Sequence, residues 1–282
     1  MNNINIDTSY IKYNNVAILG HFVSALSMII LYYDKNRLVI PYTESYLKWN
    51  SVSSNSTCPL GSRDFNTNDG RYCITSTTSP VSCDSDNNCY GVDLGWLIIS
   101  FHLLSLAAVT NFVGPIFGYR YIDMVISNKN PLRFIEYSFS ASIMLIAIAL
   151  LNGVTDINLI TSIAVLTSAC QLCGLAVEYT EIKKIKWLLH LTGWLQFCWA
   201  YGIIGHAFFK SVNSSDGVSP PSFVYVIVIV LFLLYASFGF VQLSELIFDI
   251  NPSTKEKSYV ILSLTAKLFL GWMIFSNVLL LS

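Results

Sequence analysis

The chain has 282 residues, a formal net charge of -1 at pH 7, 54% hydrophobic residues and only 12% charged residues. Soluble domains usually contain about 25% charged residues, so this composition excludes an ordinary soluble domain and indicates an integral membrane protein. The small net charge gives no reason to expect binding to nucleic acid.

Seven apolar stretches are long enough to cross a bilayer, which takes about 20 residues. They are Tyr13–Tyr33, Leu94–Phe117, Leu132–Leu151, Ile157–Val177, Trp187–Phe209, Ser222–Phe248 and Ser258–Leu281. A backbone in lipid must satisfy its own hydrogen bonds, so each stretch should be a helix. Residues 1–282 are therefore predicted to form a single all-α, seven-helix transmembrane domain with its termini on opposite sides of the membrane.

The distribution of basic residues predicts which side is cytoplasmic, because short cytoplasmic loops are enriched in Lys and Arg. The short loops on the far side from the N-terminus offer only Lys210. The N-terminal side holds Lys12, Arg120, Lys129, Arg133, Lys183, Lys184, Lys186, Lys255 and Lys257. We expect a cytoplasmic N-terminus and an extracellular C-terminus.

Residues 34–93 separate the first two helices and are predicted to form an extracellular loop insertion. Four cysteines in one exposed loop indicate two disulfides in an oxidising compartment, with three pairings open. The alternating stretch RYCITSTT predicts a small β-hairpin. Two glycosylation sequons also fall on the predicted outer side, although such short motifs occur by chance about as often. The residues concerned are Cys58, Cys73, Cys83, Cys89 and, for the sequons, Asn55 and Asn213.

Lys267 lies deep inside the last apolar stretch, where a charge costs about 2.5–3.5 kcal/mol on the lenient insertion scale. A buried lysine is explained by an ion pair, a depressed pKa or covalent use as an imine. Glu136, in the third stretch, is the candidate partner. Arg133 lies three residues before Glu136 on the same helix, so a local Arg133–Glu136 pair is the alternative.

Other polar residues within the stretches are weaker candidates. Ser263 shares a helix face with Lys267, and Trp272 lies nearby. His21 and His102 fit hydrogen-bonded core residues or a polar, water-holding pocket, and no third ligand with helical spacing suggests a metal site. Glu178 and Glu245, near the cytoplasmic ends of their helices, are interpreted as interfacial acids. The cysteines of the motif CQLC lie in mid-membrane, where core packing is the better interpretation.

Four motifs resemble the heliorhodopsins, a family of retinal-binding seven-helix rhodopsins with inverted membrane orientation. They are GHF in the first helix, FHLL in the second, NPLRFIEYSFSAS in the third and SLTAKLFLGW in the seventh. The long outer loop also fits this family, and the resemblance covers all seven helices. It implies a rhodopsin-like bundle, a homodimer with the outer loop at its interface, and no enzymatic activity.

The resemblance also implies roles for individual residues. Lys267 would bind all-trans retinal as a Schiff base, with Glu136 as counterion and Ser263 hydrogen-bonded near it. Side chains in contact with the chromophore would be Tyr137, Trp194 and Trp272. His21 and His102 would line a hydrated cavity that takes part in proton transfer on the cytoplasmic side.

Three functions remain open from the sequence. The first is a light sensor with a slow photocycle, Schiff base proton transfer and an unknown signalling partner. The second is a light-gated proton or ion conductor, with a path through Glu178, Glu245 and the histidines. The third is a membrane protein without photochemistry, in which Lys267 and Glu136 form a structural ion pair.

Overall fold

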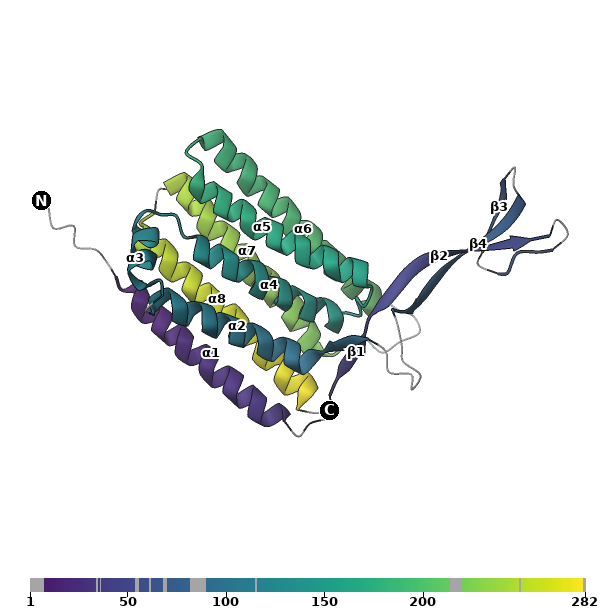
Figure 1. The fold of residues 1–282 in the computed structure, drawn as a ribbon, viewed down its shortest axis with the longest axis horizontal. Coiled ribbons are helices and arrows are strands. Elements are labelled where there is room, and N and C mark those ends of the chain that lie inside the picture. Colours follow the sequence, from purple (N-terminus) through teal and green to yellow (C-terminus); the bar gives the residue numbers. More distant parts are fainter. Residues whose placement is uncertain are drawn as a thin grey trace, which may run out of the picture.

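The computed structural model describes residues 8–33, 35, 37–53, 56–60, 62–67, 70–81, 90–114, 116–213, 220–248 and 250–280. Within these residues, seven long helices lie side by side in one bundle (Figure 1). They are α1 (Tyr10–Tyr32), α2 (Leu94–Val113), α4 (Pro131–Leu151), α5 (Ile157–Tyr179), α6 (Lys183–Val212), α7 (Ser222–Phe248) and α8 (Pro252–Ile274). A short helix, α3 (Gly118–Ile126), follows α2, and a π-helical segment, η1 (Phe275–Leu279), continues α8.

The predicted fold class is confirmed. Six of the long helices have the length and composition to cross a membrane, and α6 is the exception among those described. Its middle carries His190, Gln196 and several tryptophans, which lower its mean hydropathy, yet it packs alongside α5 (Figure 1). The start of α1 and the end of α8 lie at opposite ends of the bundle, as an odd number of spans requires.

Helix α4 is the centre of the bundle. Over its most apolar 18 residues 67% are buried, whereas the next most buried spanning helix, α8 with η1, reaches 44%. Its start follows from the sequence, because Asn130 accepts a hydrogen bond from the Arg133 amide and Pro131 occupies the first helical turn. Glu136 therefore lies in the second turn of the most enclosed helix.

Several helix boundaries differ from the prediction, including the starts of α1 at Tyr10 and of α6 at Lys183, and the differences in α2 and α8 have a clear cause. Helix α2 ends at Val113 instead of Phe117, because Gly114 adopts an extended backbone and a proline follows it in the sequence. Helix α8 begins at Pro252 instead of Ser258, with Asn251 accepting from the Ser253 amide as its N-cap. The polar segment after Pro252 resembles a loop in the sequence, but tertiary ion pairs let it continue as helix.

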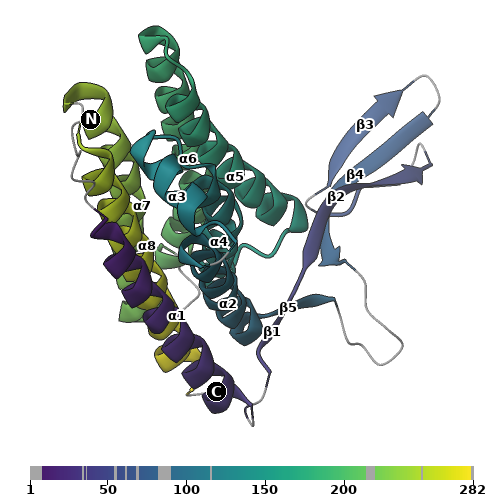
Figure 2. The ribbon, with the colours of Figure 1, turned by 60° about the vertical axis from the view of Figure 1, so that its left-hand side comes forward.

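The predicted β-hairpin is confirmed in the segment between α1 and α2. Strand β4 (Gly70–Pro80) pairs antiparallel with both β2 (Thr43–Val52) and β3 (Arg63–Thr67), and β1 (Val39–Pro41) pairs with β5 (Gly91–Asp93). The three-stranded sheet projects away from the helices (Figure 2). At its base, the Thr43 amide donates to the Thr155 carbonyl at 2.9 Å, which ties the sheet to the α4–α5 connection.

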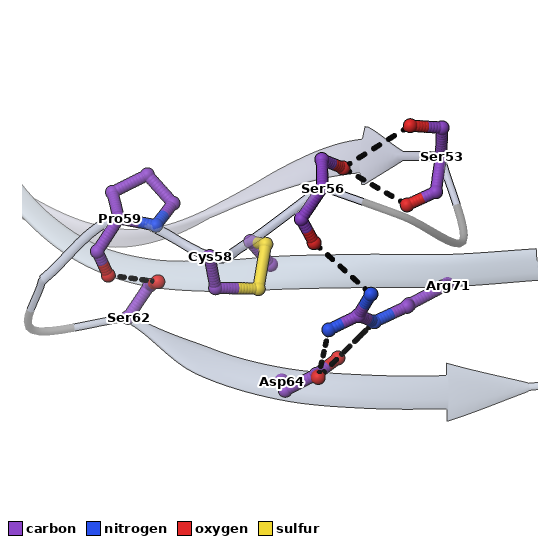
Figure 3. The surroundings of a disulfide bond; sticks show 8 residues. Ser53, Ser56, Cys58, Pro59, Ser62, Asp64 and Arg71 are labelled. Atoms are coloured by element: carbon purple, nitrogen blue, oxygen red, sulfur yellow. Dashed lines mark hydrogen bonds and ion pairs between the residues drawn. A yellow bond between two sulfur atoms is a disulfide. The ribbon is translucent and has the colours of Figure 1, made fainter.

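A disulfide joins Cys58 to Cys73 within this sheet (Figure 3). Beside it, the Arg71 guanidinium binds the Asp64 carboxylate and the Ser56 carbonyl. The Cys58–Cys73 disulfide confirms one of the two predicted bridges and shows which cysteines it joins. Cys83, Cys89 and the sequon residue Asn55 lie outside the described residues, so a second bridge stays a prediction. Asn213 ends α6, where its side-chain amide donates to the Phe209 carbonyl at 2.9 Å.

Candidate functional site

Lys267 and Glu136 meet inside the bundle. The Lys267 Nζ atom of α8 lies 2.6 Å from Glu136 Oε1 of α4, and the two side chains are only 4% and 3% exposed. Glu136 Oε1 also accepts a hydrogen bond from Ser105 Oγ of α2 at 2.6 Å. The carboxylate therefore has both a cation and a hydroxyl donor, which together offset the cost of burying it.

An aromatic ring completes the surroundings of the ammonium group. Lys267 Nζ lies 5.3 Å from the centre of the Tyr137 ring, within the range of a cation–π contact. The Tyr137 hydroxyl donates to the Tyr259 carbonyl at 3.1 Å, so the ring is held between α4 and α8. This explains how one apolar helix tolerates a lysine near its middle.

Arg133 does not take the role that the local alternative assigned to it. Its guanidinium forms ion pairs with Glu178 of α5 and Glu256 of α8, and all three side chains are almost completely buried. The alternative of a local Arg133–Glu136 pair is therefore not what forms, and Glu136 pairs with Lys267 instead. Three-residue spacing suggested the alternative because it places two side chains on one helix face, whereas the actual partners of Arg133 come from helices distant in the chain.

The Arg133 ion pairs belong to a larger buried network, here called the charged layer. It consists of Asn14, Tyr121, Asn130, Arg133, Glu178, Glu245, Lys255 and Glu256. Lys255 Nζ lies 2.7 Å from Glu178 Oε1 and 3.0 Å from Glu245 Oε2. Glu178, interpreted from the sequence as an interfacial acid, lies near the end of α5 but is buried, and Lys255 and Arg133 neutralise its charge inside the protein.

Helix α3 covers the charged layer from the side of the α1 N-terminus. The Tyr121 hydroxyl donates to Glu256 Oε1 at 2.9 Å and accepts from Asn14 Nδ2 at 2.9 Å. Burial and the neighbouring Glu256 carboxylate raise the pKa of Tyr121 well above its ordinary value. The phenol is therefore neutral at physiological pH and acts as a fixed donor to the network.

A small cavity of about 20 Å³ separates the charged layer from the Lys267–Glu136 pair. Glu136, Ser263, His21 and Glu256 all contribute to its wall, and the space is enough for about one water molecule. His102 is reached through His21, because the two Nδ1 atoms lie 3.1 Å apart. Both imidazoles are buried. Among the described residues, neither of them forms an ion pair with a charged side chain.

A larger cavity, of about 100 Å³, extends from Lys267 toward α5, α6 and α7. It is here called the aromatic cavity, because its wall includes the rings of Tyr137, Trp194, Phe197, Tyr235 and Phe238. Ser263 contributes to both cavities. Lys267 is the only lysine among the residues that line the larger space, so one amine faces a narrow aromatic enclosure.

Of the aromatic residues expected to contact the chromophore, only some line the aromatic cavity. Trp194 and Tyr137 line the aromatic cavity, but Trp272 lies elsewhere and donates from Nε1 to Ser24 Oγ of α1 at 3.1 Å. Cys170 of the CQLC motif also lies in the cavity wall. Sequence reasoning missed several participants, although the three-residue spacing of Ser105 from His102 could have pointed to one of them. The missed residues are Ser105, His190, Tyr235, Phe238 and Gln242.

Solved rhodopsin structures share this fold over nearly the whole chain. The transmembrane domain of Salpingoeca rosetta rhodopsin phosphodiesterase has a TM-score of 0.63 at 9% identity, covering 96% of this chain and 84% of that one. A thermophilic rhodopsin from Rubrobacter xylanophilus has a TM-score of 0.60 at 13% identity, covering 95% of both chains. For the light-driven proton pump LR (Mac) from Leptosphaeria maculans the values are 0.54 and 12%, with 96% and 95% covered. No curated protein sequence matches the chain.

These likenesses, at such low identity, show the class of fold alone: a seven-helix bundle like that of the rhodopsins. The family model for heliorhodopsins matches residues 11–279, and the chain belongs to the heliorhodopsin family. It is accordingly an integral membrane protein of a retinal-binding rhodopsin family. The resemblance seen in the sequence is thereby confirmed at the level of family.

Removal of the Glu136 charge tests the physical account of the buried lysine. In the retinal-free protein, Glu136→Gln leaves the Lys267 ammonium without its anion and should lower the free energy of unfolding by about 3–5 kcal/mol. Thermal unfolding in detergent measures the loss. Glu181→Gln is the matched control, because the Glu181 side chain is 79% exposed and should tolerate the same change. Equal stability of the two variants would contradict the account.

Proposed function

We propose that this protein is a light-sensing photoreceptor in which Lys267 binds all-trans retinal covalently and Glu136 is the counterion. The observation that carries the proposal is that Lys267, which lines the aromatic cavity, forms a buried ion pair with Glu136 at 2.6 Å. When bound, retinal supplies a polyene that absorbs visible light and an aldehyde carbon that condenses with an amine. The residues of the chain bind this group, compensate its charge and accept its proton.

The lining of the aromatic cavity fits such a chromophore. Its wall is formed mainly by rings and aliphatic side chains, and it offers one primary amine. Ser140 Oγ faces this region from α4 and has no hydrogen-bond partner within the described part of the chain. An elongated apolar ligand with one reactive end matches this combination better than a polar metabolite would.

Glu136 and Ser105 have complementary tasks in this proposal. Glu136 Oε1 holds the positive charge on the Lys267 nitrogen at short range in a region of low dielectric, where the attraction is strong. Ser105 Oγ donates to the same oxygen and thereby fixes the position of the carboxylate relative to Lys267. The position of the proton between Lys267 and Glu136 is then set by small changes in their geometry.

The histidine pair offers a second place for a proton. Glu136 and His21 line the same small cavity, and His21 contacts His102 through their Nδ1 atoms. A neutral imidazole has one free acceptor nitrogen and is the side chain most readily protonated near neutral pH. We infer that a proton leaving the Lys267–Glu136 region moves to His21 or His102 and returns along the same path.

Two features favour a sensor over a conductor. Toward the α1 N-terminus, which we propose is cytoplasmic, Arg133, Glu178 and Glu256 are held by ion pairs in the charged layer. Toward the other side, Ser276 and Asn277 donate to the helix carbonyls of Trp272 and Met273. Neither of these side chains can store a charge. A light-gated conductor remains the alternative, because Glu178 and Glu245 are connected through Lys255.

The covalent role of Lys267 can be tested by reconstitution. The protein with added all-trans retinal should show a visible absorption band that hydroxylamine bleaches, and Lys267→Ala should abolish the band, since Lys267 supplies the only amine among the described residues of the cavity wall. Lys210→Ala, at the end of α6, is the matched control and should keep the band. A normal pigment in the Lys267→Ala variant would refute the attachment.

The proton route predicts an imidazole signal. Time-resolved infrared difference spectra after a flash should show histidine ring bands that appear and decay with the photocycle. The double variant His21→Asn and His102→Asn should lose these bands and change the rate of recovery, because both acceptors are removed. His206→Asn, an exposed histidine of α6, should leave the spectra unchanged. Bands that persist in the double variant would place the proton elsewhere.

Electrical recording separates the sensor from the conductor. Illuminated cells that express the pigment should show very small photocurrents or none under patch clamp, because the charged layer contains no described chain of free carboxylates. Large passive currents would favour the conductor. Currents against the electrochemical gradient would show that the protein is a pump and would contradict the proposal.

A further inference from the structure

A third buried histidine, separate from the His21–His102 pair, lies in the wall of the aromatic cavity. His190 of α6 is 4% exposed, and it stands between Trp194 on its own helix and Gln242 of α7. Its Nε2 atom lies 3.0 Å from Trp194 Nε1, and its Nδ1 atom lies 3.2 Å from Gln242 Oε1. Neither the ion pairs nor the proton route uses this residue.

The direction of each hydrogen bond in this series follows from the groups at its two ends, Trp194 and Gly174. The indole Nε1–H of Trp194 can only donate, so His190 Nε2 must accept. At the other end the Gly174 carbonyl of α5 can only accept, so Gln242 Nε2 donates to it at 3.0 Å. Gln242 Oε1 is therefore left facing His190 Nδ1, which must carry the ring proton.

These contacts require one protonation state of His190. The neutral form with its proton on Nδ1 satisfies every contact in the series, whereas a charged imidazole would turn a second N–H toward the Trp194 donor. The series links α5, α6 and α7 through uncharged groups, beside a cavity whose wall also includes Lys267. His190 thus links Trp194 to Gln242 as a neutral imidazole.

The ring that His190 holds is tightly confined on its other sides. A Cβ atom at Gly239 of α7 would lie 2.7 Å from Trp194 Cζ2, so the indole occupies space that only a glycine leaves open. The rings of Phe197 and Phe240 lie 5.8 Å and 5.3 Å from the Trp194 ring, centre to centre. Packing therefore sets where the indole lies, and the hydrogen bond to His190 selects how it is turned.

We propose that His190 is a positioning residue that orients the Trp194 indole in the chromophore cavity and thereby tunes the absorption of the pigment. The inference rests on the proposed binding of retinal, and it adds a residue that acts through Trp194 without itself touching the reacting atoms. The alternative is a purely structural role, in which His190 only stabilises the contact between α6 and α7. In that case its replacement would change stability and leave the orientation of the indole unaltered.

Two replacements of His190 separate its two contacts. His190→Gln places an amide oxygen near the position of Nε2 and can still accept from Trp194, whereas His190→Asn reaches only the position of Nδ1 and leaves Trp194 Nε1 without its acceptor. His206→Asn makes the same chemical change on an exposed position of the same helix and serves as the control.

The first measurement is the absorption maximum of each pigment. His190→Asn should shift the maximum, His190→Gln and His206→Asn should keep that of the parent, and Trp194→Phe should shift it as well. Combining His190→Asn with Trp194→Phe should add no further shift, because the histidine acts through the indole. Independent, additive shifts would overturn the proposal, as would an unchanged maximum in His190→Asn.

The second measurement uses the retinal-free protein. Ultraviolet resonance Raman spectra report hydrogen bonding of indole N–H groups, and subtraction of the Trp194→Phe spectrum isolates Trp194. Its band should move to the position of an unbonded indole in His190→Asn and stay in His190→Gln. If His190→Asn does not fold, His190→Gln decides alone, and a band or an absorption maximum unlike the parent's refutes the role. Failure of the parent to form a pigment would refute retinal binding, while the Raman result would still test His190.

Discussion

The requirement that a charge inside a membrane protein be neutralised at short range governs this structure. Lys267 can lie in the middle of α8 because Glu136 lies 2.6 Å away on α4, and Glu136 is in turn fixed by Ser105 of α2. The pair joins the most enclosed helix to the last one, and both cavities adjoin it. The cost of isolating either charge is several kcal/mol, so the position of these helices relative to each other is strongly constrained.

The charged layer applies the same rule a second time. Arg133 pairs with Glu178 and Glu256, and Lys255 pairs with Glu178 and Glu245, so α4, α5, α7 and α8 meet in one set of ion pairs. Through Tyr121 and Asn14 the network also includes α3 and α1. Because Arg133 is engaged there, Glu136 is left to Lys267. The bundle therefore keeps two electrostatic centres apart on neighbouring turns of α4, with a small cavity between them.

The aromatic cavity is organised differently, by neutral hydrogen bonds and by steric limits. The series from Trp194 through His190 and Gln242 to Gly174 crosses three helices without a net charge. Gly239 leaves the space that the indole fills. Uncharged contacts of this kind hold a wall in place without disturbing the balance of charge at Lys267. A photoreceptor needs both properties, since the energy of its chromophore depends on nearby charges and on the shape of its enclosure.

The sequence by itself determined the membrane class, the seven long helices with their approximate bounds, the hairpin between α1 and α2, and the family. These features depend on local patterns: runs of about 20 apolar residues, the Asn130–Pro131 cap, the alternation in β4 and the motifs around Glu136 and Lys267. The tertiary structure decided which acid Arg133 binds, where α8 begins, that Cys58 pairs with Cys73, and that His190 and Ser105 belong to the site. The physical reason is that each of these depends on a partner from another segment. Spacing along one helix proposed Arg133 for Glu136, but only the approach of α5 and α8 supplied Arg133 with two carboxylates and left Glu136 to a lysine 131 residues away.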